Sequence, residues 1–300
     1  MRVFVTGATG FIGTAVVREL IGSGHQVLGL ARSDATARSL AAAGAEAHRG
    51  ALDDAGSLRR GAAASDGVIH TAFIHDFSNI AAAGETDRHA IEALGDALAG
   101  SSRPLVVTSA IGLLASGRVG IEDDAPDPNS AGAHRIASEV AALALASRGV
   151  RVSVVRLPPS VHGEGDHAFV PGLIRIAREK GVSAYLGEGR NRWSSVHRLD
   201  AAHLYRLALE HAPAGARFHG VADEGVPTRD IAEVIGRRLS VPVVSRSLEQ
   251  GPVHFGWLGR FFALDAVASS TRTQERLRWR PRQPGLLSDL EGGHYFETGA

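Results

Sequence analysis

The chain has no cysteine in 300 residues, a single lysine, Lys180, and three tyrosines. Without cysteine there is no disulfide, thiolate zinc site, iron–sulfur cluster or thiol nucleophile. No apolar run approaches the roughly 20 residues that span a bilayer, and the start, MRVFVTGATG, is a strand entering a glycine turn rather than a signal peptide. Acidic and basic side chains balance at 32 each, which argues against a nucleic-acid surface. We therefore expect a soluble cytoplasmic globular protein with no membrane or nucleic-acid partner.

Over the first half of the chain, short β-rich apolar runs alternate with alanine-rich helical stretches. This order is typical of a parallel sheet with crossover helices. We expect strands at 2–6, 26–31, 45–49, 67–71, 105–108 and 152–156, and helices at 11–22, 35–43, 57–64, 80–98 and 134–147. Right-handed crossovers on such a sheet predict an α/β, doubly wound, Rossmann-like fold.

The pattern changes after Arg156, where a loop-like stretch, 157–166, begins. We expect residues 1–156 to form a dinucleotide-binding domain and 157–300 to be mostly a substrate-binding portion, with segments near 196–222 returning to the core sheet. Helices are expected at 170–180 and 228–239, a strand at 216–221, a loop at 187–193 and a tail that wraps around the rest. Aromatic residues of the tail are more typical of a core than of a lid over substrate; they are Phe255, Trp257, Phe261 and Phe262.

A glycine turn, Thr6-Gly-Ala-Thr-Gly-Phe-Ile-Gly13, leads from the first strand into the first helix. Gly7 permits the tight turn, Gly10 lets backbone amides approach a pyrophosphate, and Gly13 lets the helix pack closely on the strand. The helix N-terminus supplies N–H donors and a partial positive charge. A strand–helix turn without a ligand is the alternative, but the complete βαβ unit favours dinucleotide binding. The cofactor contacts predicted here are Gly7, Thr9, Gly10, Phe11, Ile12 and Gly13.

The end of the second strand indicates which dinucleotide is bound. An acidic residue there suits the ribose 2′-hydroxyl of NAD, whereas arginine accommodates the 2′-phosphate of NADP. This chain has Arg32, a planar fork for phosphate, and Ser33, an additional donor. Asp34 is expected to be the N-cap of the next helix. The sequence therefore favours NADP over NAD.

Five further segments make the chain resemble the short-chain dehydrogenase/reductase superfamily, in its extended or atypical branch near the NAD-dependent epimerase/dehydratase-like proteins. They are Gly50-Ala-Leu-Asp53, Val68-Ile-His-Thr-Ala72, Val106-Val-Thr-Ser109, Arg156-Leu-Pro-Pro-Ser-Val-His-Gly163 and Val196-His-Arg-Leu-Asp-Ala-Ala202. The resemblance implies that Ser109, or Thr108 in a shifted register, contacts the substrate, which the last segment borders. It also implies cofactor contacts from Leu52, Asp53, Thr71, Ala72, Phe73, Pro158 and Ser160. Ala51 departs from the aspartate expected in the adenine-contacting segment.

The superfamily's usual catalytic pair, a tyrosine followed four residues later by a lysine, occurs nowhere in the chain. In the better register Arg135 replaces the tyrosine and Glu139 the lysine; a shift of one residue gives His134 and Ser138 instead. Either pair lies on one helix face. A surface ion pair is the alternative interpretation of Arg135 and Glu139.

These replacements suggest a different division of catalytic roles. Glu139 can accept hydrogen bonds from two ribose hydroxyls, so it would anchor the cofactor. Arg135 can bind an oxyanion but is too basic to donate a proton near pH 7. Proton transfer then requires a hydroxyl, water or a histidine, because imidazole titrates near neutrality; the candidates are His134, His162 and His197.

The leading hypothesis is an NADPH-dependent oxidoreductase that reduces a carbonyl of a small, partly apolar substrate, acting as a monomer or homodimer. A non-catalytic NADP-binding sensor or scaffold is the first alternative, since loss of the tyrosine and lysine is typical of such proteins. An epimerase or dehydratase is the second. No metal site is expected, because His70 and His75 flank a strand end without a third nearby ligand.

Overall fold

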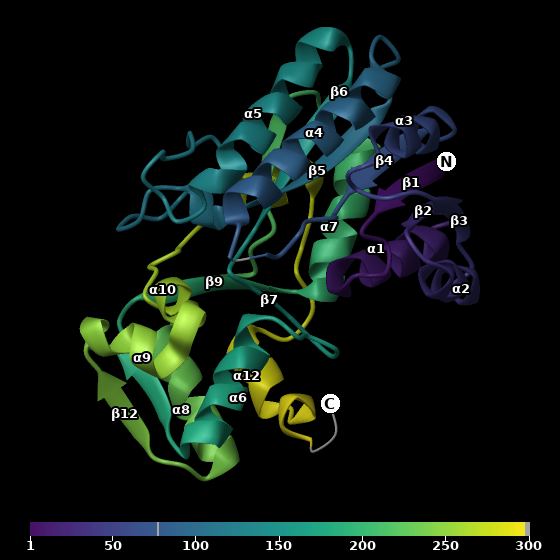
Figure 1. Ribbon diagram of the computed structural model, residues 1–300. Helices are drawn as coiled ribbons and strands as arrows, with labels where there is room; N and C mark the ends of the chain where they lie inside the picture. The colour runs from purple at the N-terminus through teal and green to yellow at the C-terminus, as the bar shows by residue number, and fades with distance from the viewer. Residues whose placement is uncertain (77, 298–300) are drawn as a thin grey trace.

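In a computed structural model, which describes residues 1–76 and 78–297, seven parallel strands form one sheet (Figure 1). The strand order is β10-β6-β5-β4-β1-β2-β3, so the order reverses between β1 and β4. This reversal is the switch point of a doubly wound fold, and it confirms the expected fold class. The strands are β1 (Arg2–Thr6), β2 (Gln26–Ala31), β3 (Glu46–Arg49), β4 (Gly67–His70), β5 (Pro104–Ala110), β6 (Arg151–Leu157) and β10 (Ala216–His219).

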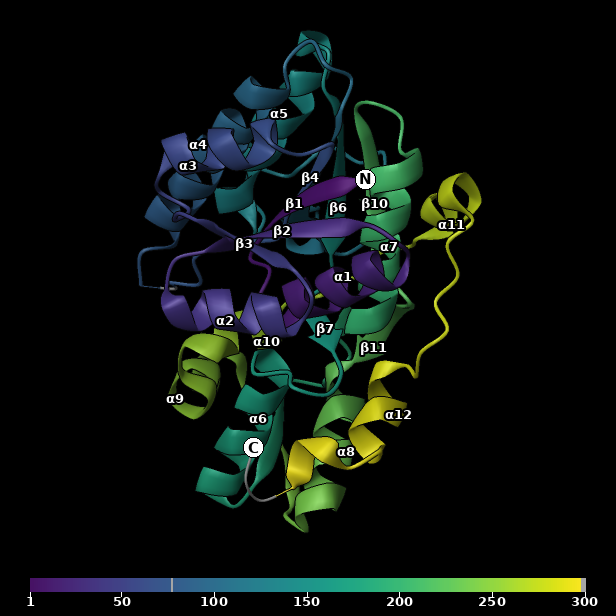
Figure 2. The same cartoon turned by 90° about the vertical axis from the view of Figure 1, so that its right-hand side faces the viewer.

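Helices cover both faces of this sheet because successive strand residues point to opposite sides. Val3 and Val5 face one side, where they pack with α1 (Phe11–Gly22), α2 (Asp34–Ala42) and α7 (Arg198–His211). Phe4 faces the other side with α3 (Ala55–Ala63), α4 (Ile80–Leu98) and α5 (Ile136–Ala144). Figure 2 shows α1, α2 and α7 on one side of the strands and α3, α4 and α5 on the other.

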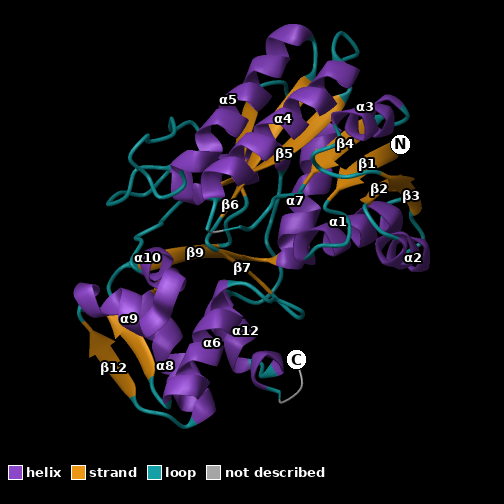
Figure 3. Cartoon of the chain, viewed as in Figure 1, coloured by secondary structure: helices purple, strands orange, loops and turns teal. Residues whose placement is uncertain are grey.

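A second lobe lies beyond the carboxyl ends of the strands and has its own apolar core (Figure 3). Of the tail aromatics expected in a core, Phe255 and Phe262 are buried there beside Trp193, Phe261 is partly buried, and Trp257 is about half exposed. The lobe comprises α6 (Phe169–Lys180), α8 (Thr228–Leu239), α9 (Gly251–Phe255), α10 (Gly259–Phe262), α12 (Leu286–Glu291), β8 (Ser183–Leu186) and β12 (Val243–Arg246). Between the main sheet and this lobe runs a three-stranded sheet of β7 (Ser160–His162), β9 (Arg192–His197) and β11 (Asp223–Pro227).

The chain passes more than once between the two parts. After β9 it enters α7 and then β10, which pairs with β6 at the edge of the main sheet. The tail then returns through α11 (Thr271–Leu277) to bind α7, where the Trp279 indole donates to the Asp200 carbonyl at 3.0 Å. The Asp200 carboxylate accepts from the backbone N–H groups of Arg282 and Gln283.

The elements that the sequence did not predict lie in the second half: the short strands β7, β8, β9, β11 and β12, and the helices α7, α9, α10, α11 and α12. β7 lies within the expected loop 157–166, and β9 begins inside the expected loop 187–193. β9 is buried on both sides and carries Ser194 and Ser195 there, so it lacks the apolar alternation of a half-buried strand. The expected helix 134–147 is three pieces, and only α5 is α-helical, so His134 and Arg135 precede it in a 3₁₀ turn. Within residues 1–76 and 78–297, no helix is both long and apolar enough to cross a membrane.

Candidate cofactor and substrate site

The glycine turn after β1 has the geometry that a dinucleotide requires. Gly7 has φ of +68°, and a Cβ there would lie 2.7 Å from the Ala72 nitrogen, in the segment after β4. A Cβ on Gly13 would lie 1.9 Å from the Gly7 carbonyl oxygen, so α1 packs directly on the turn. A Cβ on Gly10 would meet only that same oxygen, at 3.2 Å. Gly7 and Gly13 are thus required by packing, whereas Gly10 leaves its side of the turn open.

The N-terminus of α1 is suited to a diphosphate. Gly10 is its N-cap, and no side chain caps the helix, so the first-turn N–H groups have no intrahelical acceptor. Thr9 and Gly10 are exposed beside them. The guanidinium of Arg198 lies 5.1 Å from the centre of the Phe11 ring, which places a further cation near the turn. Exposed N–H donors and positive charge are what a pyrophosphate binds.

The residues expected around the adenosine also lie at the sheet's carboxyl end. Arg32 is exposed, and it pairs with no carboxylate in the described part of the chain. Ser33, rather than Asp34, is the N-cap of α2: its Oγ accepts from the Thr36 N–H at 3.2 Å. The prediction for Asp34 is therefore wrong by one residue, because the helix begins at Asp34, which pairs with Arg49 instead.

The expected adenine contacts border a hollow of about 110 Å³. Two of its lining residues, Leu52 and Asp53, come from the segment after β3, and the others lie on α3 and α4. Those others are Ala55, Leu58, Thr86, His89 and Ala90. An adenine ring bound there would lie between two helices, in line with the glycine turn's place at the switch point.

The segments expected beside the nicotinamide follow β4 and β6. The segment after β4 is hydrogen-bonded to Thr6 at the end of β1. The Thr6 Oγ1 accepts from the Ala72 N–H at 3.3 Å, and the Thr6 carbonyl accepts from the Thr71 hydroxyl at 2.8 Å. Pro158 and Ser160 are buried in the second, with Ser160 already on β7. Their contacts with the cofactor remain predictions.

Arg135 and Phe73 form the centre of the candidate substrate site. The guanidinium of Arg135 lies 4.1 Å from the centre of the Phe73 ring, and the residue is only 7% exposed. Its Nη2 donates to the Thr108 carbonyl of β5 at 2.5 Å, whereas its Nε has no hydrogen-bond partner among the described atoms. Ser109 follows Thr108 on β5 and its buried hydroxyl is likewise unpartnered. Two of the predicted catalytic residues are therefore linked through β5, and both retain free polar atoms.

A buried chain of polar groups that the sequence did not predict supports Arg135 from behind. Asp87 of α4 is fully buried; its Oδ2 lies 3.7 Å from Arg135 Nη2, and its Oδ1 accepts from His70 Nε2 at 3.0 Å. His70 Nδ1 lies 2.8 Å from Thr6 Oγ1. Burial alone would raise the pKa of Asp87, but Arg135 and His70 lower it below its usual value. An aspartate within an alanine-rich helix was the available signal for this contact.

Glu139 has a different position from the one expected. Its two carboxylate oxygens accept from the guanidinium of Arg156 at 3.1 and 2.5 Å, and Arg217 lies 3.3 Å away. Glu139 and Arg156 are 1% and 0% exposed. Burial would raise the pKa of Glu139, but the hydrogen bonds and charge of Arg156 lower it. The expectation that Glu139 anchors the ribose is therefore corrected: its acceptors are engaged by β6, so it is neither a surface ion pair nor available for ribose hydroxyls.

Of the three candidate proton donors, His134 lies nearest to Arg135. Its ring is 6.1 Å from that of Phe73, and burial, followed by the charges of Arg135 and Arg260, lowers the pKa of His134. His162 instead hydrogen-bonds Asp289 of α12 at 2.8 Å. His197 is the N-cap of α7.

The shifted register, with His134 and Ser138 as the replacement pair, is not favoured. The Ser138 hydroxyl donates to the Gly84 carbonyl of α4 at 3.3 Å and is buried there. Tyr205 of α7 is also excluded as a conventional acid, because it is fully buried against Thr108 Oγ1 at 2.6 Å and burial raises its pKa.

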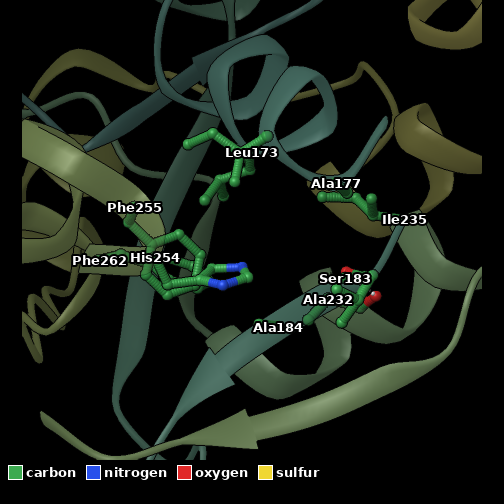
Figure 4. A pocket seen from close by; sticks show the side chains of 11 residues that line it. Leu173, Ala177, Ser183, Ala184, Ala232, Ile235, His254, Phe255 and Phe262 are labelled. Carbon is green, nitrogen blue, oxygen red and sulfur yellow. Dashed lines mark hydrogen bonds between the residues drawn. The ribbon is translucent and has the colours of Figure 1, made fainter. Parts of the chain in front are cut away.

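A second, very small hollow, of about 10 Å³, lies inside the second lobe (Figure 4). It is lined by apolar side chains of α6, β8, α8, α9 and α10, and the His254 ring and the Ser183 hydroxyl are its polar groups. None of the residues predicted to bind cofactor or substrate lines it. We therefore treat it as a packing defect of that lobe's core.

A parallel sheet in this order, with a glycine turn at the switch point, is typical of dinucleotide-binding α/β proteins. The chain belongs to the NAD dependent epimerase/dehydratase family, whose sequence profile matches residues 3–219. The resemblance to the extended short-chain dehydrogenase/reductases is thereby confirmed.

Individual proteins extend this result along the whole chain. An uncharacterised protein of Schizosaccharomyces pombe is 50% identical over 99% of this chain and 100% of its own length. A 2-alkyl-3-oxoalkanoate reductase of Stenotrophomonas maltophilia is 28% identical, over 83% of this chain and 78% of that protein. A dTDP-glucose 4,6-dehydratase from Streptomyces venezuelae, solved with NAD bound, shares the fold with a TM-score of 0.80 and 21% identity, over 98% and 96% of the two chains. Family and relatives together indicate an NAD(P)-dependent enzyme of oxidoreductase or epimerase type.

Proposed function

We propose that this protein is an NADPH-dependent oxidoreductase that reduces the carbonyl group of a small substrate. The observation that carries the proposal is Arg135, a buried cation with an unpartnered Nε, at the position that the resemblance aligns with the family's tyrosine. When bound, NADPH supplies a hydride to the carbonyl carbon, and the oxygen must then gain a proton. The protein's part is to bind that oxygen, stabilise its developing charge and deliver the proton.

Arg135 and Ser109 would share the binding of the substrate oxygen. A guanidinium stabilises negative charge but stays protonated at any physiological pH, so Arg135 orients and stabilises without transferring a proton. Ser109 offers a buried hydroxyl on the adjacent strand residue, close enough to Glu139 to help lower the pKa of that carboxyl. His134, or water near it, would complete proton transfer.

Two further observations support the choice of reaction and cofactor. A relative that covers most of the chain is named as a reductase of an oxoalkanoate, which is a carbonyl reduction. Arg32 is exposed and has no carboxylate partner in residues 1–76 and 78–297. It can therefore donate hydrogen bonds to a 2′-phosphate, which supports NADPH rather than NADH as the cofactor.

The direct test measures NADPH oxidation with a panel of aldehydes, ketones and oxo acids. We expect Arg135→Gln to lower kcat/KM by at least about tenfold with the same NADPH affinity, because it removes a charge-assisted contact to the oxygen. Arg148→Gln, on the surface behind α5, is the control and should retain activity. A protein that binds NADPH tightly and oxidises none of it would support the sensor alternative, and sugar-nucleotide isomerisation without net NADPH loss would support an epimerase.

The pH dependence tests the proton donor. His134 must be protonated to donate, and its pKa is lowered from the usual 6.5. Reduction should therefore accelerate as pH falls from 8 through 6.5 and level off only below the usual histidine range. His134→Phe should remove this rise, whereas His211→Phe, at an exposed histidine at the end of α7, should retain it; a rise that persists in His134→Phe would leave water or substrate as the donor.

A further inference from the structure

We propose that Arg198, the first residue of α7, binds the diphosphate of the cofactor, and that the loop at 163–167 and the C-terminal tail hold it in place. The inference goes beyond the proposed reaction, because it applies to any activity that uses NAD or NADP. The glycine turn at 6–13 offers backbone N–H groups to the diphosphate but contains no cationic side chain. Arg198 supplies that charge from the second half of the chain.

Arg198 lies beside the N-terminus of α1. It begins α7, and α7 and α1 lie side by side in Figures 1 and 2. Its guanidinium lies 5.1 Å from the centre of the ring of Phe11, the first residue of α1, which is within the range of a cation–π contact. Gly10 is the N-cap of α1, and no side chain caps the helix. A diphosphate that binds the first-turn N–H groups is therefore within reach of the arginine side chain.

The loop that follows β7 lies against Arg198. Gly163 and Gly165 both have positive φ, of +129° and +84°. A Cβ on Gly163 would lie 3.3 Å from Arg198 Cγ, and a Cβ on Gly165 would lie 3.5 Å from Arg198 Nη1. Glycine at these two positions thus lets the loop backbone approach both the stem and the guanidinium of Arg198. The side chain is therefore restrained by this loop and by the Phe11 ring.

The C-terminal tail fixes the loop in turn. The Tyr295 hydroxyl accepts from the Gly163 N–H at 3.0 Å and donates to Asp166 Oδ2 at 3.1 Å. Asp166 Oδ1 also accepts from the Ala168 N–H at 2.8 Å. The carboxylate of Asp166 is thus occupied by the loop and the tail, so it does not neutralise Arg198.

Arg198 has N–H donors available for a ligand. In residues 1–76 and 78–297, no carboxylate pairs with it and no hydrogen bond engages its guanidinium. The residue is partly buried, so its N–H groups lose part of their hydration without gaining a protein acceptor. A guanidinium is a planar fork that matches two phosphate oxygens. The His167 ring, 6.0 Å from that of Phe11, brings a second nitrogen-bearing side chain to the same place.

The position of Arg198 matches the diphosphate rather than either end of the cofactor. The 2′-phosphate is expected at Arg32, after β2, and the adenine at the hollow between α3 and α4. The carbonyl substrate is expected at Arg135, beside β5. The diphosphate joins the two nucleosides and binds at the glycine turn, and this is the turn that Arg198 contacts through Phe11.

The experiment measures Kd, without substrate, for ligands that contain or lack the diphosphate. NADPH, NADH and 2′-phosphoadenosine diphosphoribose contain it, the last without a nicotinamide, whereas 2′-AMP lacks it. Arg198→Gln should raise the first three Kd values about tenfold, because one charge-assisted contact is lost, and leave that of 2′-AMP unchanged. Arg198→Lys should recover part of the affinity. Urea unfolding of Arg198→Gln should match the wild type, since no ion pair within the described residues is lost.

Two further variants test the geometry. Arg229→Gln is the matched control, because Arg229 also lies at the start of a helix, α8, with its guanidinium 5.5 Å from the centre of an aromatic ring, that of Tyr185; its Kd values should equal those of the wild type. Tyr295→Phe retains Arg198 but releases the loop, so it should raise the three Kd values about threefold through lost preorganisation.

The outcomes separate this inference from its alternatives. Unchanged Kd values for NADPH and NADH in Arg198→Gln would overturn it. An equal rise for 2′-AMP would move the contact to the adenosine end, and a rise confined to NADPH and NADH would move it to the nicotinamide. No effect of Tyr295→Phe would contradict the role given to the loop and the tail. Because no substrate is present, a protein that binds NADPH in this way and reduces nothing would overturn the proposed function and leave the diphosphate contact intact.

Discussion

Arg135 shows how one residue changes the chemistry available to this fold. A tyrosine in its place would be a proton donor, whereas a guanidinium is a permanent charge with several N–H groups in a plane. The chain supplies it with a carbonyl acceptor from Thr108, an aromatic face from Phe73 and a carboxylate from Asp87. His70 completes the arrangement: if Thr6 donates to its Nδ1, its Nε2–H donates to Asp87, as both distances allow. Because these contacts fix the Arg135 guanidinium on several sides, its positive charge is suited to orienting a substrate.

The proposed preference for NADPH depends, at the same scale, on Arg32. Because it is exposed and unpaired with any described carboxylate, its removal should leave the fold intact. Arg32→Ala should weaken NADPH binding about tenfold or more and leave NADH nearly unchanged, since one charge-assisted contact to phosphate contributes roughly 1.5–3 kcal/mol. Titration calorimetry with both cofactors measures this. Arg38→Ala, an exposed arginine on α2, is the control; equal losses for both cofactors would contradict the assignment.

At the scale of elements, the first half of the fold could be predicted closely. The bounds of β1, α1, β2 and α4 agree with the sequence expectation, because their apolar residues have clear periodicity and their ends carry glycine or polar residues. The glycine turn was predictable for the same reason: Gly7 and Gly13 occupy positions that exclude a side chain. Asp87 could not be placed, because its contacts with His70 and Arg135 join segments distant in sequence and have no local pattern.

Helix α5 gives the clearest case in which sequence position misled. Alignment with the family's motif placed Glu139 at the position of the catalytic lysine. In the structure, however, the buried Arg156 of the neighbouring strand β6 donates hydrogen bonds to both carboxylate oxygens of Glu139. Arg156 also donates to the carbonyls of Glu122 and Asp124, at 3.3 and 3.0 Å. The pair thus joins α5, β6 and the segment that precedes α5, and its function is structural.

This assignment predicts a loss of stability rather than of cofactor affinity. Glu139→Ala leaves a fully buried guanidinium without its carboxylate, which costs about 3–5 kcal/mol. Urea unfolding measures the loss, and Glu139→Gln provides a milder variant for binding assays. Glu233→Ala, at a partly exposed residue, removes the Arg229 pair on α8 and should cost less than about 1 kcal/mol. A Glu139→Gln protein that is stable but binds NADPH tenfold more weakly would restore the ribose-anchoring role.

At the scale of the whole molecule, hydrogen bonds of His219 and Glu122 join the main sheet to the C-terminal tail. His219 at the end of β10 bonds the Ser269 carbonyl through Nδ1 at 2.8 Å, and its backbone N–H donates to the Thr273 hydroxyl of α11. Glu122 accepts from both the N–H and the hydroxyl of Thr273 at 2.7 Å. The tail is therefore held by buried polar groups whose protonation state matters for folding.

Acid should weaken the whole fold through His219 before most carboxylates titrate. Burial lowers the pKa of His219 to about 4, whereas an unfolded histidine titrates near 6.5. Between these values the unfolded chain binds the extra proton, so stability rises with pH there and is lost on acidification, by up to about 3 kcal/mol from this residue. Glu139 and Asp87, whose pKa values are lowered, add their losses only below their unfolded values near 4. Urea unfolding from pH 7 to 4.5 should show a slope that His219→Gln reduces and that exposed His89→Gln leaves unchanged. If the free energy of unfolding depends on pH with the same slope in the wild type, His219→Gln and His89→Gln, the acid sensitivity arises from other histidines.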